Sequence, residues 1–237
     1  MSDLGNKKYL DILTKETLYC LYTDAIDCIC KMQNEVDTSG LETFNKSAQM
    51  NEMSLFDEWY LDKHLEINLS KKQSEELHQC YEHIYTIISK IPKSFIHRDF
   101  HSRNLMVTSE KNPGVLDYQD AVTGPITYDI ASLLKDCYVS WDDETVYSMT
   151  SSFFAKIERH HDMVYEEFEY WFDITGLQRH LKAIGIFSRL NYRDNKSNYL
   201  GDIPRTINYV TKMLSKYSEL SELKRILSDI NLDKTYD

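Results

Sequence analysis

The residues between His97 and Asn104 have the types and spacing that phosphoryl transfer requires. They read His-Arg-Asp-Phe-His-Ser-Arg-Asn, so an Asp lies two residues after the His and an Asn lies five residues after that Asp. An Asp in this pattern can accept the proton of an attacking hydroxyl, and the Asn can ligate a magnesium ion that holds nucleotide phosphates. We therefore predict that Asp99 is the catalytic base and that Asn104 is a metal ligand.

A second Asp completes the predicted metal site. Asp117 follows Asn104 by thirteen residues, and two short apolar runs, 105–107 and 114–116, lie between them with turn-forming residues in the middle. A hairpin of these runs would bring Asn104 and Asp117 to the same end, where one cation could bridge them. Two protein oxygens suffice because Mg²⁺ keeps several of its waters. The first motif alone could arise by chance, but the second Asp after a matching hairpin favours the functional interpretation.

Most of the remaining chain has the periodicity of amphipathic helices. Ser70 and Gln73 form a capping-box pattern, and apolar residues then recur at three- and four-residue steps until Pro92. The run Phe95-Ile96 is expected to lead into the catalytic loop as a strand. Loops are expected at 39–40, 124–125 and 195–201, and further helices at 15–33, 48–64, 129–139, 144–159, 165–190 and 204–227, the last with a break near Tyr217. The fold class predicted is mainly α with a small β-hairpin.

The composition limits the classes of partner. The chain has 27 Lys and Arg against 38 Asp and Glu, a net charge of −11, which disfavours nucleic acid and anionic membranes as partners. No segment approaches the roughly eighteen apolar residues of a membrane span, and no signal pattern is visible at the N-terminus. The five cysteines are odd in number and lack zinc-site spacing, so we expect reduced core residues. These features predict a cytoplasmic protein that acts on small molecules.

The chain resembles the aminoglycoside phosphotransferase-like kinases, which carry H-x-D-x-x-x-x-N and then an Asp-containing loop where protein kinases have Asp-Phe-Gly. Within that family, segments 95–106, 114–121 and 124–129 look most like the bacterial cell-wall amino-sugar kinases. These enzymes phosphorylate N-acetylmuramate and N-acetylglucosamine on the anomeric hydroxyl with ATP. The resemblance extends over nearly the whole chain through further segments at 3–5, 57–61, 176–182, 185–187, 193–194 and 199–205.

The resemblance implies a fold, cofactors and supporting residues. Residues 1–237 would form the C-terminal, catalytic and substrate-binding lobe of a protein-kinase-like fold, with ATP and Mg²⁺ as cofactors and a role in peptidoglycan recycling. His97, Arg98 and His101 would support the catalytic loop. Asp129 follows a Gly-Pro turn and precedes an apolar run, so we expect a helix N-cap there. The resemblance implies that Asp129 also braces the catalytic loop.

The resemblance also predicts a missing part. Kinases of this type have an N-terminal lobe of about a hundred residues, with a phosphate-covering loop and a strand Lys paired to a helix Glu. No Gly-x-Gly-x-x-Gly pattern is visible, and segment 3–5 resembles the hinge that follows that lobe. We expect the nucleotide-binding lobe to be absent through truncation or to be supplied by a separate chain. The isolated chain would then bind ATP weakly, be inactive alone and tend to self-associate.

A basic stripe is the first candidate for substrate binding. Arg179, Lys182, Arg189 and Arg193 would lie within an arc of about 80° if one helix runs through them. N-acetylmuramate carries a lactyl carboxylate, which bidentate arginines such as Arg179, Arg189 and Arg193 could bind. The alternative is that these cations pair with acidic residues of neighbouring helices, as helix charges commonly do.

An aromatic cluster is the second candidate. Trp59 could stack on the face of a sugar together with Phe56 and Tyr60. Aromatic residues at helical spacing more often form a core, and this interpretation stays open.

Two other functions also remain open. A kinase for an aminoglycoside, choline or homoserine would carry the same catalytic loop, and the acidic chain would suit a cationic aminoglycoside, but segment 178–205 favours the amino sugar. A non-catalytic remnant lobe could act as a binding module. Its retention of Asp99, Asn104 and Asp117 argues against long decay.

Overall fold

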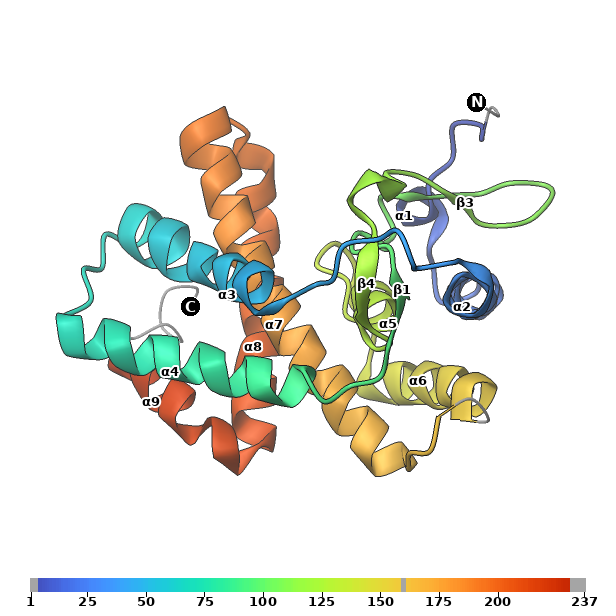
Figure 1. Cartoon of the computed structure of the whole chain (residues 1–237). Helices are drawn as coiled ribbons and strands as arrows, with labels where there is room; N and C mark the ends of the chain where they lie inside the picture. The colour runs from blue at the N-terminus through green and yellow to red at the C-terminus, as the bar shows by residue number, and fades with distance from the viewer. Residues whose placement is uncertain (1–3, 159–160, 231–237) are drawn as a thin grey trace. The chain divides into compact units, whose positions relative to one another are not determined.

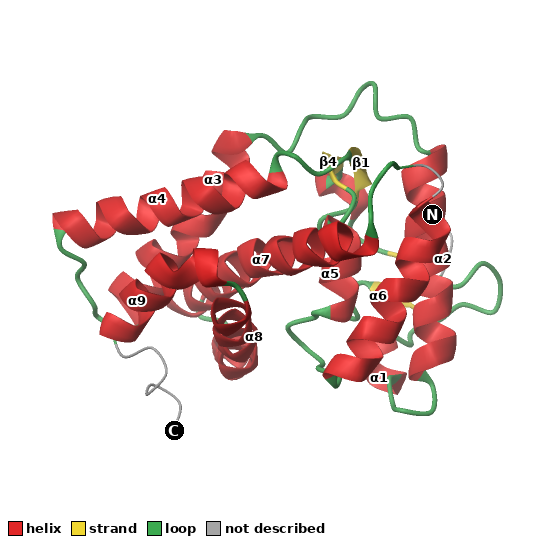
Figure 2. Cartoon of the chain, turned by 90° about the horizontal axis from the view of Figure 1, so that it is seen from below, coloured by secondary structure: helices red, strands yellow, loops and turns green. Residues whose placement is uncertain are grey.

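The computed structural model describes residues 4–158 and 161–230, and the chain forms two compact units. Unit 1 consists of Met1–Phe44 and Ile91–Phe172, and unit 2 consists of Asn45–Lys90 and Asp173–Asp237. Helices predominate and the strands are short (Figure 1 and Figure 2). The predicted fold class, mainly α with a small β-hairpin, is confirmed.

Unit 1 contains two small antiparallel sheets among helices. β1 (Lys93–Ile96) pairs with β4 (Val122–Pro125), and β2 (Leu105–Met106) pairs with β3 (Gly114–Val115). The helices are α1 (Tyr9–Ile12), α2 (Leu18–Glu35), α5 (Tyr128–Leu134) and α6 (Asp143–Ile157), with a 3₁₀ turn η2 (Tyr118–Asp120). Helix α2 contacts β1, α5 and α6 (Figure 1). Its buried Tyr22, Ile26 and Ile29 therefore contribute to the core under the β1–β4 sheet.

The predicted hairpin after the catalytic loop is confirmed. In β2 and β3, Leu105 pairs with Val115 and Met106 pairs with Gly114. The loop that joins the two strands is held at its base because Asn112 Nδ2 donates to Tyr9 Oη at 2.8 Å and to Asp24 Oδ2 at 2.7 Å. These bonds tie the hairpin to α1 and α2.

Within its described residues, unit 2 contains helices and no strand. Its elements are α3 (Lys46–Leu55), the π-helix η1 (Phe56–His64), α4 (Lys71–Ile88), the part of α7 (Tyr165–Asp194) from Asp173 onward, η4 (Ser197–Asp202), α8 (Ile203–Lys216), η5 (Ser218–Leu220) and α9 (Ser221–Asp229). The predicted capping box at Ser70 and Gln73 opens α4, and α8 ends before Tyr217 as predicted. Helix α4 contacts α3 and α9.

Several predicted boundaries are wrong. The helix expected at 48–64 is α-helical only to Leu55 and continues as a π-helix, and the helix expected at 129–139 ends at Leu134. The loop expected at 195–201 contains η4. Periodicity alone does not show where tertiary contacts change the hydrogen-bond pattern. Asp3 and Arg159, at the edges of two expected segments, lie outside the described residues.

The cysteines are free thiols, as expected, but they are not all core residues. Cys137 is buried, whereas Cys20 is exposed. Burial raises the pKa of the Cys28, Cys30 and Cys80 thiols to about 11. These three thiols are therefore protonated at neutral pH, which makes them poor nucleophiles.

A close backbone approach fixes the packing inside unit 2. A Cβ added at Gly185 of α7 would overlap the carbonyl carbon and oxygen of Leu55. Leu55 is the last residue of α3, directly before the π-helix that begins at Phe56. Because backbone atoms cannot move aside as a flexible side chain can, this position requires glycine.

Gly185→Ala should lower the free energy of unfolding by about 1–3 kcal/mol, since the added methyl forces two backbones apart. Gly201→Ala is the matched control in the same unit, because a Cβ there meets open space. Its stability should stay within about 0.5 kcal/mol of the wild type. Urea denaturation followed by far-ultraviolet circular dichroism measures both variants, and equal losses would contradict the close-approach argument.

Candidate functional site

The catalytic loop follows β1 and is held by the carboxylate of Asp129. Asp129 Oδ2 accepts the backbone N–H of His97 at 2.7 Å, and Oδ1 accepts the backbone N–H of Arg98 at 3.0 Å. Asp129 is fully buried. Thr127 is the N-cap of α5 and Asp129 is its second residue, so the expected N-cap role is wrong. The carboxylate is used by the loop instead of by its own helix.

Asp99 lies at the centre of this loop. It is half-buried between the buried residues His97 and Phe100. Its carbonyl oxygen accepts Asn104 Nδ2 at 3.2 Å and the His101 N–H at 3.1 Å. These bonds close the loop between the predicted base and the predicted metal ligand. Since Asn104 donates through Nδ2, its Oδ1 is the atom that can ligate a cation.

Asp117 lies at the same end of the hairpin as Asn104. The N–H of Leu116 donates to the carbonyl of Asn104 at 3.0 Å. The residue directly before Asp117 is therefore hydrogen-bonded to Asn104. Asp117 is exposed and has left-handed backbone angles, with φ of 59°. Asp tolerates this conformation better than most residues do. The turn leads the chain from β3 into η2.

The two oxygen donors fit a hard cation. A carboxylate and an amide oxygen suit Mg²⁺, which keeps water in its remaining positions, better than they suit Zn²⁺. Over the described ranges, no group of three or more His, Cys, Asp or Glu side chains could hold a metal. The Asn104 and Asp117 pair therefore has the chemistry of a site completed by water and phosphate.

His97 is buried under the loop as a neutral ring. The Asp99 N–H donates to His97 Nδ1 at 3.3 Å, so a neutral imidazole carries its proton on Nε2. Burial lowers the pKa of His97, and the negative charge of Asp99 opposes this shift only in part. The structure thus assigns His97 a packing and hydrogen-bonding position, without exposure to a reacting group.

Arg98 and His101 are placed by aromatic contacts. The Arg98 guanidinium lies 5.5 Å from the centroid of the Phe44 ring, and its Nη1 donates to the Asp120 carbonyl at 3.4 Å. The His101 ring packs edge-on against Tyr138 at 5.2 Å. Both residues tie the loop to neighbouring parts of unit 1.

Asp136 and Tyr138 also contact the loop, although no sequence pattern predicted them. Asp136 Oδ2 accepts the N–H of Ser102 at 2.9 Å, and its Oδ1 accepts the N–H of Tyr138, also at 2.9 Å. The Arg103 guanidinium lies 3.6 Å from the Tyr138 ring centroid. Residues 129–139 were predicted to be one helix, but α5 ends at Leu134, and Asp136 and Tyr138 lie in the segment that follows it. An Asp that hydrogen-bonds the backbone two residues on is a known turn signal and could have revealed the helix end.

The basic stripe lies on one helix, α7, but two of its members have acidic neighbours. Lys182 Nζ is 2.9 Å from Glu52 Oε1, and Arg193 makes two hydrogen bonds to Asp194 at 2.8 and 2.9 Å. Arg179 is buried and Arg189 is half-buried. The stripe is therefore no continuous solvent-facing surface.

The aromatic cluster divides in the same way. Phe56 and Tyr60 are fully buried and belong to the core, whereas Trp59 is half-buried. Only Trp59 of these three has exposed ring surface that a ligand could contact.

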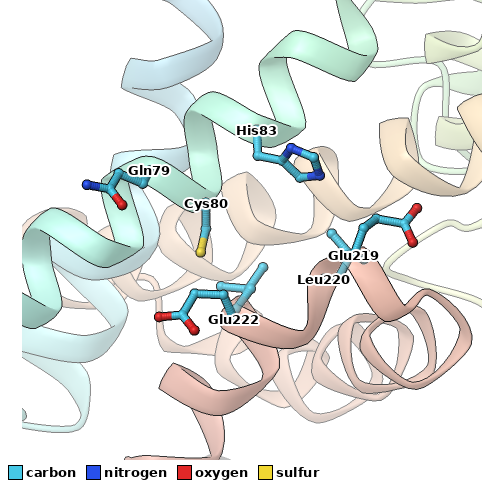
Figure 3. A pocket seen from close by; sticks show the side chains of 7 residues that line it. Gln79, Cys80, His83, Glu219, Leu220 and Glu222 are labelled. Atoms are coloured by element: carbon cyan, nitrogen blue, oxygen red, sulfur yellow. The ribbon is translucent and has the colours of Figure 1, made fainter.

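A small pocket in unit 2 contains none of the predicted site residues. It has a volume of about 200 Å³ and lies between α4 and the η5–α9 segment, where side chains such as Cys80 and His83 face Leu220 (Figure 3). Glu222 at its rim is already paired with Arg225 at 2.6 Å. The pocket therefore adds nothing to the predicted chemistry.

Comparisons with known proteins identify the family of the chain. Residues 1–160 match the model of the phosphotransferase enzyme family. A Pseudomonas putida protein named N-acetylmuramate/N-acetylglucosamine kinase is 37% identical over 97% of this chain and 68% of its own length. A Neisseria meningitidis protein of the same name is 36% identical over 97% of this chain and 71% of its own length.

Solved structures share the fold at low identity. The ADP-bound aminoglycoside phosphotransferase APH(2'')-Ib superposes with a TM-score of 0.51 at 17% identity, covering 88% of this chain and 70% of that one. Choline kinase from Cryptosporidium parvum gives 0.53 at 15%, covering 91% and 70%. No helix among the described residues is long and apolar enough to cross a membrane.

The fold is that of the aminoglycoside phosphotransferase and choline kinase structures. The chain belongs to the phosphotransferase enzyme family.

Burial of His97 should make stability depend on pH. Because its pKa is below the ordinary value of 6.5, the unfolded chain takes up a proton at a higher pH than the native chain does. This contribution to stability should be fully present above about pH 6.5 and be lost as the pH falls.

His97→Asn keeps an acceptor for the Asp99 N–H and removes the titration, so the loss of stability between pH 7 and 5 should shrink. His83→Asn changes an exposed histidine and should keep the wild-type slope. Urea denaturation across this pH range measures both, and an unchanged slope for His97→Asn would count against a neutral buried ring.

Proposed function

We propose that the full protein containing this chain uses ATP to phosphorylate N-acetylmuramate and N-acetylglucosamine on the anomeric hydroxyl. The observation that carries the proposal is a half-buried Asp99 in a braced loop, with Asn104 and Asp117 together at the end of the adjoining hairpin. Relatives named N-acetylmuramate/N-acetylglucosamine kinase are 36–37% identical over 97% of the chain. Cytoplasmic peptidoglycan recycling is the process that this substrate pair implies.

Asp99 acts as the base in this proposal. Its carboxylate orients the attacking sugar hydroxyl and accepts its proton as the new bond to phosphorus forms. The base must stay fixed relative to the phosphate, because catalysis in this class depends mainly on positioning. Asp129 fixes the position of Asp99 because it accepts the backbone N–H groups of His97 and Arg98, which directly precede it.

Asn104 and Asp117 would hold Mg²⁺ in this proposal. Bound there, the ion would neutralise charge on the nucleotide phosphates. Asn104 contributes a neutral oxygen fixed by its own bond to Asp99, and Asp117 contributes the negative charge. Loss of the Asp117 charge should therefore lower the affinity for Mg²⁺ and leave the proton-accepting role of Asp99 intact.

The substrate carboxylate is proposed to bind arginines of α7. Arg179 and Arg189 are our first candidates, because the planar guanidinium matches the geometry of a carboxylate. Arg193 forms a bidentate pair with Asp194 that a ligand would have to displace. The half-buried Trp59 could stack on the apolar face of the sugar. These assignments concern specificity between the two sugars and not the chemical step.

The full protein incubated with Mg-ATP and either sugar should give ADP and a sugar phosphate that has lost its reducing end. Asp99→Asn keeps the size of the side chain and removes the proton acceptor, so kcat should fall by roughly 10² to 10⁴ with little change in sugar KM. Asp120→Asn, an exposed carboxylate nearby, is the control. An Asp99→Asn enzyme with unchanged kcat would refute the assignment of the base.

Asp117→Asn should have a different signature. It weakens the charge that holds the cation, so its defect should be partly relieved at high Mg²⁺, whereas the Asp99→Asn defect should not. Steady-state rates over a range of Mg²⁺ concentrations distinguish the two. The same Mg²⁺ response in both variants would remove Asp117 from the metal site.

Arg179→Ala and Arg189→Ala should raise KM for N-acetylmuramate by about tenfold or more and change KM for N-acetylglucosamine much less. Only the first sugar carries the lactyl carboxylate, so the second sugar is the internal control. Equal losses for both sugars would reduce these arginines to a structural role.

A further inference from the structure

We propose that Asp136 and Tyr138 are positioning residues of the kinase site, which fix the second half of the catalytic loop and with it the metal ligand Asn104. The inference rests on the proposed function, since it assumes that Asn104 holds Mg²⁺. Asp129 binds the backbone of His97 and Arg98, whereas Asp136 and Tyr138 contact residues 101–103. All of these residues belong to unit 1.

Asp136 supplies the hydrogen-bonding part of this second brace. It is 2% exposed, and both of its carboxylate oxygens accept backbone N–H groups at 2.9 Å, one from Ser102 and one from Tyr138. A buried carboxylate is costly unless such donors are present. The interaction is of the same kind as that of Asp129 with His97 and Arg98, so the loop is held by one buried carboxylate in each half.

Tyr138 supplies the packing part. The Arg103 guanidinium lies over its ring at 3.6 Å, and the His101 ring meets it edge-on at 5.2 Å. Arg103 and His101 flank Ser102 in the sequence. Three consecutive loop residues are thus held by the short segment that follows α5, through two ring contacts and one hydrogen bond.

The geometry of Asn104 depends on these three residues. The Asn104 N–H donates to the His101 carbonyl at 2.9 Å, and its side chain donates to the Asp99 carbonyl at 3.2 Å. The N–H of Leu10 also donates to the Ser102 carbonyl at 3.1 Å, which supports the loop from the side of α1. A shift of residues 101–103 would therefore move the Asn104 amide that we propose ligates the cation. Residues that orient a metal ligand commonly change metal affinity when replaced.

Replacing the ring while keeping apolar bulk tests this brace. Tyr138 is half-buried, so Tyr138→Leu should fold, and Tyr138→Phe is the matched variant that keeps the ring contacts. Tyr19→Leu replaces an exposed tyrosine of the same unit and reports nonspecific effects. Each variant is measured in the full protein by amide hydrogen exchange and by the Mg²⁺ dependence of phosphate transfer.

In Tyr138→Leu, exchange should accelerate about tenfold in peptides covering residues 100–107, with peptides of unit 2 unchanged. The Mg²⁺ concentration for half-maximal rate should rise about tenfold, with sugar KM within about twofold of the wild type. Tyr138→Phe and Tyr19→Leu should keep the wild-type exchange and Mg²⁺ dependence. Asp136→Asn should shift exchange in the same direction, because its NH₂ group faces one of two backbone donors.

Unchanged exchange at residues 100–107 in Tyr138→Leu would overturn the proposal. So would acceleration spread evenly over unit 1, or a rise in sugar KM without a change in Mg²⁺ dependence. Absence of phosphate transfer in the wild type would instead refute the proposed function. The exchange measurement would still decide whether the segment after α5 holds the loop.

Discussion

The hydrogen bonds from the backbone of His97 and Arg98 to the carboxylate of Asp129 are the constraint on which the site depends. A buried N–H without an acceptor costs about 1–3 kcal/mol, and a buried carboxylate without donors costs more, so each group meets the need of the other. Arg98 has φ of 75°, a conformation that an unsupported loop residue would rarely keep. The bonds to Asp129 therefore stabilise the strained backbone of Arg98. Asp99 directly follows Arg98 in the chain.

The end of the hairpin at which we propose that Mg²⁺ binds is set by backbone pairing. Asn104 precedes β2, Asp117 follows β3, and the bond between Leu116 and Asn104 continues the ladder beyond the strands. A hairpin register is either right or wrong by a whole residue, so the backbone positions of Asn104 and Asp117 relative to each other are restricted to discrete values. The left-handed angles of Asp117 then turn the chain out of the ladder and into η2.

In unit 2, a buried carboxylate of α3 has side-chain partners on α7. Glu52 is buried and accepts hydrogen bonds or ion pairs from Lys182 and from Gln178, each at 2.9 Å. Such a network fixes how α3 meets α7, and Gly185 allows the two backbones to approach. Part of the cationic stripe that could bind a substrate carboxylate is thus used for helix packing.

The sequence by itself determined most of the elements and the candidates for the site. Motif spacing selected Asp99, Asn104 and Asp117 as the predicted base and metal ligands, and short-range signals such as the Ser70 capping box and the apolar runs around the hairpin predicted structure that is present. Tertiary structure decided the rest, because it depends on residues far apart in the chain. The end of α5 at Leu134, the change to a π-helix at Phe56 and the contact of Asp136 with Ser102 each involve a hydrogen-bond pattern or a partner that local periodicity cannot encode. The same holds for the burial of His97 and Arg179, which is a property of the packed units and not of the residue types.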